Sequence, residues 1–398
     1  MKLDKDFFIE VAHVQKFKHG QKVCGDTFMS MKVKHDKRII AVLSDGLGSG
    51  VRANVISTMT ATMAITYSAN KYDNIKAAET IMNTLPIDSV RKISYATFTI
   101  VDIDYEGKCD IIDYDNPPFI LIRDGKRFAT PNKQYLGNIT SLSRKYTLNM
   151  ASFKLQLGDK LIIFSDGVNQ SGMGSNALPF GWGVDKVQEF CEYLATKYPN
   201  MAARSFAQEI VEYANANSDY EPQDDITCCV INIRKPRMLA VLTGPPVDKA
   251  KDSLMGDIVR NYEGRTAICG GTTAKILSRE LQRDVEVDIS TLDPIVPCSS
   301  TMEGVDLVTE GMLTMGEALK HLESKEFIGD IKTENGATKL VRLFLDSDII
   351  EFYVGTKIND AHQDPNMPVE LGIRRNTIRS IAKVLEERYL KDTKIKFL

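Results

Sequence analysis

The sequence lacks the features that mark membrane-spanning, secreted and nucleic-acid-binding proteins. None of its apolar runs approaches the roughly 20 residues of a membrane-spanning helix. Its N-terminus, MKLDKDFFIE, contains no apolar stretch of the signal-peptide kind. A formal net charge of −3 gives no basis for a nucleic-acid or anionic-membrane surface. We therefore expect a cytoplasmic protein that binds neither membranes nor nucleic acids.

Residues that build zinc sites are also scarce. The chain has 5 histidines, and its 7 cysteines are an odd number without the CxxC spacing of a zinc site. We expect these thiols to be reduced and mostly buried. A redox or metal-sensing pair of Cys269 and Cys298 is the less favoured alternative. Carboxylates are therefore the better candidates for chemistry.

The length and composition indicate a globular protein with more than one domain. An apolar content of 43% and a charged content of 26% are ordinary for a soluble protein, and 398 residues are enough for two domains. The basic segment RKPR at 234–237 separates two different patterns of apolar residues. We expect domains at 1–235 and 236–398.

The first domain is predicted to be an α/β sandwich of two mainly antiparallel sheets flanked by helices. Helix 50–69 carries Val51, Val55, Met59 and Met63 at spacings of four, which predicts that this stripe packs on a sheet. Strands 153–157 and 160–165 are expected to pair through the turn at Gly158. The predicted strands are 6–18, 22–34, 39–43, 95–102, 108–114, 119–123, 126–130, 153–157, 160–165 and 226–233, and the helices are 50–69, 73–84, 185–197 and 201–217.

In the second domain, strands alternate with helices, which predicts a smaller α/β domain with a partly parallel sheet. Strands are predicted at 239–243, 266–269, 285–289, 304–308, 339–355 and 394–398, and helices at 247–261, 272–282, 312–323 and 369–390. Cys269-Gly270-Gly271 leads into a helix whose free N–H groups could bind an anion. The segment lacks the GxxxxGK[ST] spacing, so a tight turn capped by threonine is the favoured interpretation.

Aspartates stand at four strand ends in the first domain. A single aspartate of this kind is usually a solvated turn residue. Four within one sandwich indicate a cluster of like charges that cations must hold together. An all-oxygen site suits Mg²⁺ or Mn²⁺. The segments are Gly25-Asp26, Asp45-Gly46, Asp166-Gly167 and Asp224-Asp225.

The order of these motifs resembles a known family. The series GD, SDGLGSG, DNPPFILIRDG, LQLGDKLIIFSDGV, FGWG and DDIT over residues 8–233 is similar to the SpoIIE/RsbU-type branch of the PPM (PP2C-like) serine/threonine phosphatases. The resemblance implies a PP2C-like fold and metal-dependent hydrolysis of phosphoserine or phosphothreonine in a bacterial signalling protein. Related enzymes act on phosphorylated anti-anti-sigma-like (STAS) proteins, so a partner of that class is implied.

The resemblance also assigns roles to residues. It implies two Mn²⁺ or Mg²⁺ ions, with Asp45 bridging them and the Gly46 carbonyl binding one. Asp26 would serve the same pair of ions, and Asp45 and Asp166 would be the residues on which catalysis depends. Asp166 and Asp224 would hold the other ion.

Three positions depart from the family pattern or leave a choice open. Asp225 lies beside Asp224, and the family pattern favours Asp224 as the direct ligand. Leu47 stands where eukaryotic-type members have a histidine that is a candidate general acid. Lys22 is the nearest cation upstream of Asp26 and a candidate for contacting the substrate phosphate, and it is equally well read as an exposed strand charge.

Other functions remain open. The fold could be a degenerate phosphatase that binds a phosphoprotein or another partner without turnover. The domain at 236–398 could regulate the phosphatase or bind a partner, and a third alternative gives it the main activity, although it offers no catalytic cluster. The sequence leaves homo-oligomerisation open.

Overall fold

The computed structural model describes residues 7–85, 96–139, 144–324, 334–356 and 369–398. The chain forms two compact units, Met1–Lys235 (unit 1) and Pro236–Leu398 (unit 2). No helix in the described ranges combines the length and apolar character needed to cross a membrane. All seven cysteines are free thiols and six are buried, as expected, and Cys298 is half-buried.

Unit 1 contains two antiparallel sheets. The first has the order β2-β3-β4-β5-β9-β8, with strands Asp26–Val33, Arg38–Gly46, Ala96–Asp104, Lys108–Tyr114, Arg144–Lys154 and Asn132–Ile139. The second has the order β1-β11-β10-β6-β7, with strands Phe8–Lys16, Ile226–Arg234, Lys160–Phe164, Ile120–Arg123 and Lys126–Arg127. This is the predicted PP2C-like sandwich.

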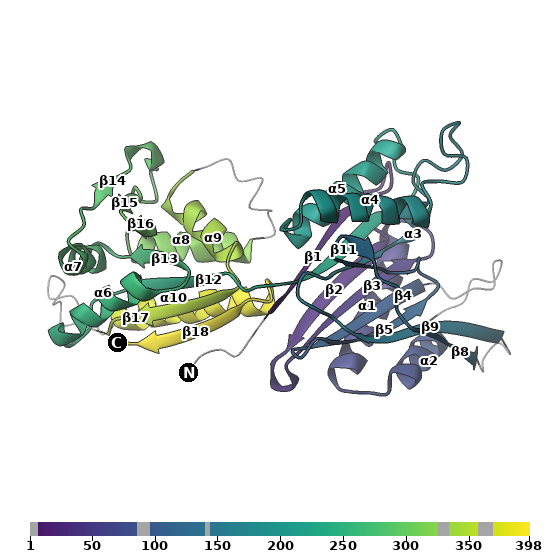
Figure 1. The fold of residues 1–398 in the computed structure, drawn as a ribbon, viewed down its shortest axis with the longest axis horizontal. Helices are drawn as coiled ribbons and strands as arrows, with labels where there is room; N and C mark the ends of the chain where they lie inside the picture. The colour runs from purple at the N-terminus through teal and green to yellow at the C-terminus, as the bar shows by residue number, and fades with distance from the viewer. Residues whose placement is uncertain (1–6, 86–95, 140–143, 325–333, 357–368) are drawn as a thin grey trace. The chain divides into compact units, whose positions relative to one another are not determined.

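Helices cover the two sheets from opposite sides (Figure 1). Helices α1 (Gly50–Ala69) and α2 (Asn74–Thr84) pack on the six-stranded sheet through one apolar core. Helices α4 (Val184–Lys197) and α5 (Ala203–Asn217) pack on the five-stranded sheet through another. Short helices η1 (Lys34–Asp36) and α3 (Asp166–Asn169) complete the elements described in this unit.

The face that α1 turns toward the sheet differs from the prediction. Val51, Val55 and Met59 are 67%, 51% and 46% exposed, and Met63 is partly buried. The buried positions are mostly small: Gly50, Ala53, Ile56, Ser57, Thr60, Ala61, Ala64, Ile65 and Ser68. The reason is close approach, because a Cβ on Gly46 of β3 would lie only 2.1 Å from the carbonyl oxygen of Ala53. Bulky side chains at these contacts would force the helix away from the strand.

Two strand predictions in unit 1 are also wrong. Segments 153–157 and 160–165 do not pair, because β9 lies between β5 and β8 while β10 lies between β11 and β6 in the other sheet. The prediction also missed β8 and most of β9. The chain therefore crosses between the sheets at Gly158, where a hairpin was expected.

Unit 2 is built on a mixed, mostly parallel sheet with the order β14-β15-β16-β13-β12-β17-β18. Its strands are Glu286–Val287, Ser300–Met302, Val305–Thr309, Arg265–Cys269, Met238–Thr243, Ile349–Val354 and Asp392–Phe397. Strands β16, β13, β12, β17 and β18 run parallel to one another, and β15 is antiparallel to both β14 and β16. Its helices are α6 (Asp252–Asn261), α7 (Gly271–Leu281), α8 (Met312–Glu323), α9 (Gly336–Leu345) and α10 (Val369–Glu387), with η2 (Lys249–Lys251) and η3 (Ile289–Thr291).

The predicted strand at 339–355 is correct only in its second half. Residues Gly336–Leu345 form α9, and only Ile349–Val354 is a strand. Asn335 starts the helix, because its side chain accepts hydrogen bonds from the N–H groups of Ala337 and Thr338 at 3.0 Å while the Thr338 hydroxyl accepts one from the Asn335 N–H. This capping box selects a helix in a segment whose apolar run suits either structure.

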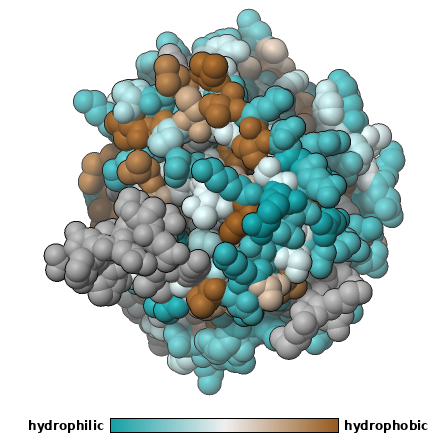
Figure 2. Space-filling model, turned by 90° about the vertical axis from the view of Figure 1, so that its left-hand side faces the viewer, coloured by the Kyte–Doolittle hydropathy of each residue, from teal (hydrophilic) through white to brown (hydrophobic). Residues whose placement is uncertain are grey.

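Some large apolar side chains of unit 2 are exposed. Ile289, Leu292 and Ile295, which follow β14, are 77%, 78% and 68% exposed. The face shown in Figure 2 is mainly hydrophilic, and its hydrophobic side chains gather toward the upper left. Exposed apolar patches are typical of interaction surfaces.

Candidate metal centre

The strand register places the four predicted aspartates at neighbouring strand ends, two from each sheet. Asp26 begins β2 and lies directly opposite Asp45 near the end of β3. Asp166 begins α3 just beyond β10, and Asp224 precedes β11, the antiparallel neighbour of β10. The sandwich therefore gathers at one place carboxylates that are up to about 200 residues apart in the chain.

The side chains of these aspartates interact. The carboxyl of Asp45, when protonated, is within hydrogen-bond reach of the carboxylates of Asp26 and Asp166. The charge of Asp224 raises the pKa values of Asp45 and Asp26, and the charge of Asp166 raises the pKa of Asp224. The four carboxyls form one electrostatic cluster.

The pKa of every carboxyl in the cluster is raised. Burial is the largest cause for all four, and it raises the pKa of Asp26, which is 3% exposed, to about 7. Neighbouring carboxylates raise the pKa values of Asp26, Asp45 and Asp224 further. Because like charges repel in a buried site, the cluster without a cation must hold protons near neutral pH.

Polar neighbours hold two of these side chains in place. The Thr227 hydroxyl donates to Asp26 at 2.6 Å, and Ser165 also hydrogen-bonds Asp26. The Gln170 amide donates to Asp166 at 3.0 Å. Sequence reasoning did not single out Thr227, Ser165 or Gln170. Their positions beside the DDIT and SDG motifs are the only signal that could have pointed to them.

The two adjacent aspartates before β11 have different surroundings. Asp225 is buried, and its two carboxylate oxygens accept hydrogen bonds from the N–H groups of Lys18 at 2.9 Å and Gly25 at 2.8 Å. It therefore fastens the loop between β1 and β2. Asp224 is half-buried, and the negative charge of Asp166 raises its pKa. Both carboxylate oxygens of Asp225 are thus engaged by backbone N–H groups of the β1–β2 loop, whereas Asp224 accepts the Asp225 N–H at 3.0 Å. We therefore propose Asp224, in preference to Asp225, as the candidate ligand.

The glycines of the SDG motifs are explained by packing. A Cβ on Gly46 would lie 2.1 Å from the carbonyl oxygen of Ala53, and a Cβ on Gly167 would lie 2.1 Å from that of Asp225. Any side chain at either position would push the adjacent aspartate out of the cluster.

The cluster fits a hard divalent cation. One oxygen of Asp166, Oδ1, is buried and has no hydrogen-bond partner among the described residues. The donors are all oxygens, which Mg²⁺ and Mn²⁺ prefer. No three His, Cys, Asp or Glu side chains of the described ranges are close enough to hold an ion by themselves. A site of one or two carboxylates completed by waters is the usual arrangement for Mg²⁺.

Comparison with known proteins identifies the family of unit 1. Residues 35–234 match the family described as Stage II sporulation protein E (SpoIIE). The chain belongs to the SpoIIE family. Its part at 35–234 is a SpoIIE-type PP2C phosphatase domain, and no family is assigned to unit 2.

Two curated relatives come from Bacillus subtilis (strain 168). Phosphoserine phosphatase RsbX is 26% identical over 202 residues, which are 49% of this chain and 92% of RsbX. Stage II sporulation protein E is 25% identical over 231 residues, which are 58% of this chain but only 26% of that protein.

Solved structures are similar at lower identity. A structure of the PP2C domain of B. subtilis SpoIIE with a fragment of its regulatory domain is 20% identical, with a TM-score of 0.47 over 57% of this chain and 62% of that chain. A structure of RsbX in complex with magnesium is 21% identical, with a TM-score of 0.40 over 57% of this chain and 96% of that chain.

Two predicted positions in this SpoIIE-family domain concern the substrate phosphate and its leaving group: the cation Lys22 and the general-acid position, Leu47. Lys22 is exposed in the turn before β2. Lys18 is half-buried, and its charge lowers the pKa of Asp224 against the dominant effect of burial, so it is the nearer cation to the cluster. Leu47 is half-buried beyond Gly46. Lys18 was missed because it stands eight residues before Asp26, outside the motif.

A pocket of about 190 Å³ adjoins the cluster. Asp224 and Gly167 form part of its wall, and the polar segment after α3 forms another part. Its lining is Gly167, Gln170, Ser171, Gly172, Met173, Ser218, Pro222, Gln223 and Asp224.

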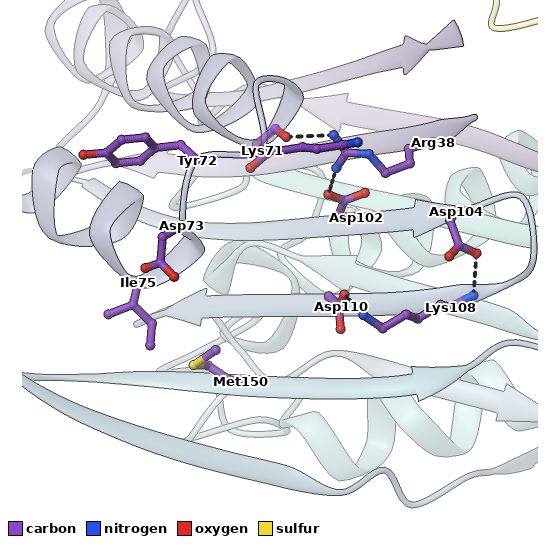
Figure 3. A pocket seen from close by; sticks show the side chains of 11 residues that line it. Arg38, Lys71, Tyr72, Asp73, Ile75, Asp102, Asp104, Lys108, Asp110 and Met150 are labelled. Carbon is purple, nitrogen blue, oxygen red and sulfur yellow. Dashed lines mark hydrogen bonds and ion pairs between the residues drawn. The ribbon is translucent and has the colours of Figure 1, made fainter. Parts of the chain in front are cut away.

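A second pocket, of about 490 Å³, lies at the opposite end of the six-stranded sheet (Figure 3). Arg38 starts β3 there, seven positions before Asp45, and forms an ion pair with Asp102. Lys108 pairs with Asp110 at 2.9 Å. Cations and carboxylates of this pocket therefore neutralise one another, unlike the aspartates of the cluster.

Proposed function

We propose that unit 1 is a metal-dependent protein phosphatase that hydrolyses phosphoserine or phosphothreonine in a bacterial signalling protein. The observation that carries the proposal is the convergence of four carboxylates with raised pKa values and one unpartnered buried oxygen. When bound, Mn²⁺ or Mg²⁺ supplies Lewis acidity, which lowers the pKa of water and neutralises phosphate charge.

The chain's own residues have separable roles in this proposal. Asp45 lies between Asp26 and Asp166 and is the candidate bridging ligand, with the Gly46 carbonyl beside it. Asp166 and Asp224 form the other half of the centre. Thr227 and Gln170 orient these carboxylates through the hydrogen bonds described above.

Substrate handling depends on the surface beside the cluster. The pocket next to Asp224 is the candidate seat for the chain around the phosphorylated residue. Lys18 and Lys22 are the candidate cations for the phosphate. Leu47 has no proton to donate to the leaving alkoxide, so water must supply it, and we expect slower turnover than with a histidine there.

The proposed class of substrate is inferred from the relatives of this chain. RsbX carries the name phosphoserine phosphatase, and the family resemblance points to phosphorylated anti-anti-sigma-like (STAS) proteins as substrates and partners. A degenerate fold that binds a phosphoprotein without turnover is the competing function. Leu47 is the observation that favours it, and the full set of aspartates opposes it.

Hydrolysis assays separate the two. The full chain is incubated with a phosphoserine peptide and with p-nitrophenyl phosphate, in Mn²⁺, Mg²⁺ or EDTA. Turnover that needs the metal and disappears in Asp45→Ala and Asp166→Ala supports the phosphatase. A folded chain that binds the phosphopeptide but releases no phosphate with either metal contradicts it.

A further inference from the structure

The parallel strands of unit 2 end in line. The register pairs Val354 of β17 with Thr243 of β12, Thr243 with Cys269 of β13, and Cys269 with Thr309 of β16. The strands are parallel, so their carboxyl ends form one edge. The residues that follow these ends are Gly355, Gly244, Gly270 and the pair Glu310-Gly311.

This edge contains the reversal of a doubly wound sheet. From β12 the chain passes through α6 to β13 on one side, and from β17 it passes through α10 to β18 on the other. Helices α6 and α7 pack on one face, and α8, α9 and α10 pack on the other. The reversal lies between β12 and β17, and β13 is the next strand beyond β12. In open α/β sheets, small ligands bind outside the carboxyl ends close to such a reversal.

Two glycines beside this edge are not required by packing. A Cβ on Gly355 would lie 2.2 Å from the carbonyl oxygen of Gly244, so close approach explains both of those residues. By contrast, a Cβ on Gly271 would come no nearer than 3.6 Å to Glu310, and one on Gly311 no nearer than 3.5 Å to Gly270. Neither has a positive φ. The backbone is therefore open to close approach at Gly271, the first residue of α7, and at Gly311, which precedes α8.

A buried hydroxyl at the start of α7 lacks a partner. Thr273 is 0% exposed, and its Oγ1 has no hydrogen bond among the described residues. This oxygen lies 3.2 Å from the position of a Cβ on Gly270, so it points into the turn between β13 and α7. Thr314, in the first turn of α8, has an equally buried and unpartnered hydroxyl. Leaving a buried polar group unpaired is unfavourable, and a ligand oxygen would pair with it.

Charged groups at the edge indicate the ligand's chemistry. The Arg374 guanidinium of α10 lies over Gly244, with Nη1 2.6 Å from the position of a Cβ there. Arginine and helix N-termini both favour phosphate oxygens. The Glu310 carboxylate accepts the Gly311 N–H at 2.6 Å and lies beside Gly271. A carboxylate next to a phosphate site accepts hydroxyl donors, as from a ribose.

We propose that the carboxyl edge of the unit 2 sheet binds a ribose phosphate, carried by a nucleotide. The phosphate lies against the first turn of α7, where Gly271 allows close approach and Thr273 donates its hydroxyl. The ribose hydroxyls lie toward Glu310. All residues of the proposed site belong to unit 2.

Isothermal titration calorimetry of the full chain tests this proposal, with EDTA present to keep the metal centre of unit 1 out of the measurement. The probes are AMP, ADP, ATP and NAD⁺, with ribose 5-phosphate and inorganic phosphate as the two smaller sources of the same chemistry. We expect at least one nucleotide to bind with a Kd below about 1 mM. Binding of ribose 5-phosphate without any nucleotide supports the site with a free sugar phosphate as its source.

Matched variants locate the binding. Thr273→Val removes the hydroxyl in the first turn of α7, at the edge. Thr266→Val removes another buried, unpartnered hydroxyl, near the start of β13 and so away from that edge. Gly271→Ala adds a methyl group at the edge, whereas Gly316→Ala adds one within α8, where nothing lies within 4 Å. We expect Thr273→Val and Gly271→Ala to weaken binding at least tenfold and the two controls to leave it unchanged.

Two results overturn the proposal. One is the absence of saturable binding by every probe. The other is an affinity that changes equally in Thr273→Val and Thr266→Val. Neither result bears on phosphatase activity, because the metal is chelated and no residue of unit 1 is altered.

Discussion

The two units differ in the chemical groups that they gather at strand ends. In unit 1, two antiparallel sheets bring together carboxylates whose pKa values are raised, chiefly by burial and further by one another. In unit 2, parallel strands line up glycines, helix N-termini and an arginine. We therefore propose a cation for unit 1 and an anion for unit 2. The sheet type contributes to this difference, because parallel strands place their carboxyl ends, and the helices that follow them, along one edge.

The glycines of the two units differ for the same reason. Gly46 and Gly167 are fixed by contacts of 2.1 Å that a Cβ would make with backbone oxygens. Gly271 and Gly311 meet nothing closer than 3.5 Å. Gly46 and Gly167 of unit 1 therefore serve packing, as Gly244 and Gly355 of unit 2 do, whereas Gly271 and Gly311 leave space.

The largest effect is expected in unit 1, on activity. Asp45→Asn removes the central carboxylate of the cluster, and we expect about a 1,000-fold loss of kcat, since the variant forfeits ligation of both ions. Asp124→Asn is the matched control, because Asp124-Gly125 is also an aspartate–glycine pair at a strand turn and asparagine tolerates its φ of 50°. Phosphopeptide hydrolysis measures both. Equal activities would remove Asp45 from the centre.

Substitutions of the adjacent Asp224 and Asp225 should have different effects, one on activity and the other on stability. Asp225→Asn loses one of two charged acceptors for backbone N–H groups, and we expect about 2 kcal/mol of destabilisation in urea unfolding. Asp224→Asn should leave stability within about 0.5 kcal/mol and reduce metal-dependent hydrolysis strongly. The reverse pattern would make Asp225 the ligand.

Metal should stabilise the protein more at high pH than at low pH. The cluster holds protons up to near pH 7 because its pKa values are raised, and a cation must displace them. We expect Mn²⁺ to raise the Tm by several degrees at pH 8 and by less at pH 6. A shift that is equal at both values would show that Mn²⁺ binds elsewhere.

A smaller pH effect is expected at Asp113, away from the cluster. Burial raises its pKa to about 7, against an ordinary 3.8, and Thr99 donates a hydrogen bond to it at 2.7 Å. The folded state then binds more protons than the unfolded state between these values, so this group makes the protein less stable as pH rises from about 4 to 7. We expect Asp113→Asn to gain about 5 °C in Tm relative to wild type between pH 4 and pH 8. If the difference in Tm between Asp113→Asn and wild type is the same at pH 4 and pH 8, Asp113 is ionised in the native state at both pH values.

The smallest effect is expected in unit 2. Gly316→Ala within α8 should stabilise the protein by less than about 1 kcal/mol, because no atom obstructs the methyl group and alanine favours the helix. Thermal unfolding measures the change. Marked destabilisation would mean that the methyl group meets an obstruction there.

The sequence predicted most elements but not the faces that they present. Periodicity located α1, yet Val51, Val55 and Met59 point to solvent, because β3 approaches too closely for bulky side chains. That approach depends on tertiary packing, which helical spacing does not encode. The same limit applies to β9 and β10, whose adjacent sequences lie in different sheets.

In the candidate site, the motifs pointed to the aspartates, and the structure gathers them. The sequence motifs could not identify the residues that hydrogen-bond to these aspartates. Thr227 and Ser165 support Asp26 from the facing sheet, so only the stacking of the sheets brings them there. The different surroundings of Asp224 and Asp225 likewise depend on the backbone of the β1–β2 loop, which lies about 200 residues earlier.

Metal titration by calorimetry tests most directly the claim that the four carboxylates form one metal centre. The wild-type chain is titrated with Mn²⁺ at pH 8 beside Asp45→Asn, Asp166→Asn and the control Asp124→Asn. We predict two ions per chain for wild type and for Asp124→Asn, and loss of tight binding in the other two. Binding that is unchanged in Asp45→Asn and Asp166→Asn would contradict the account.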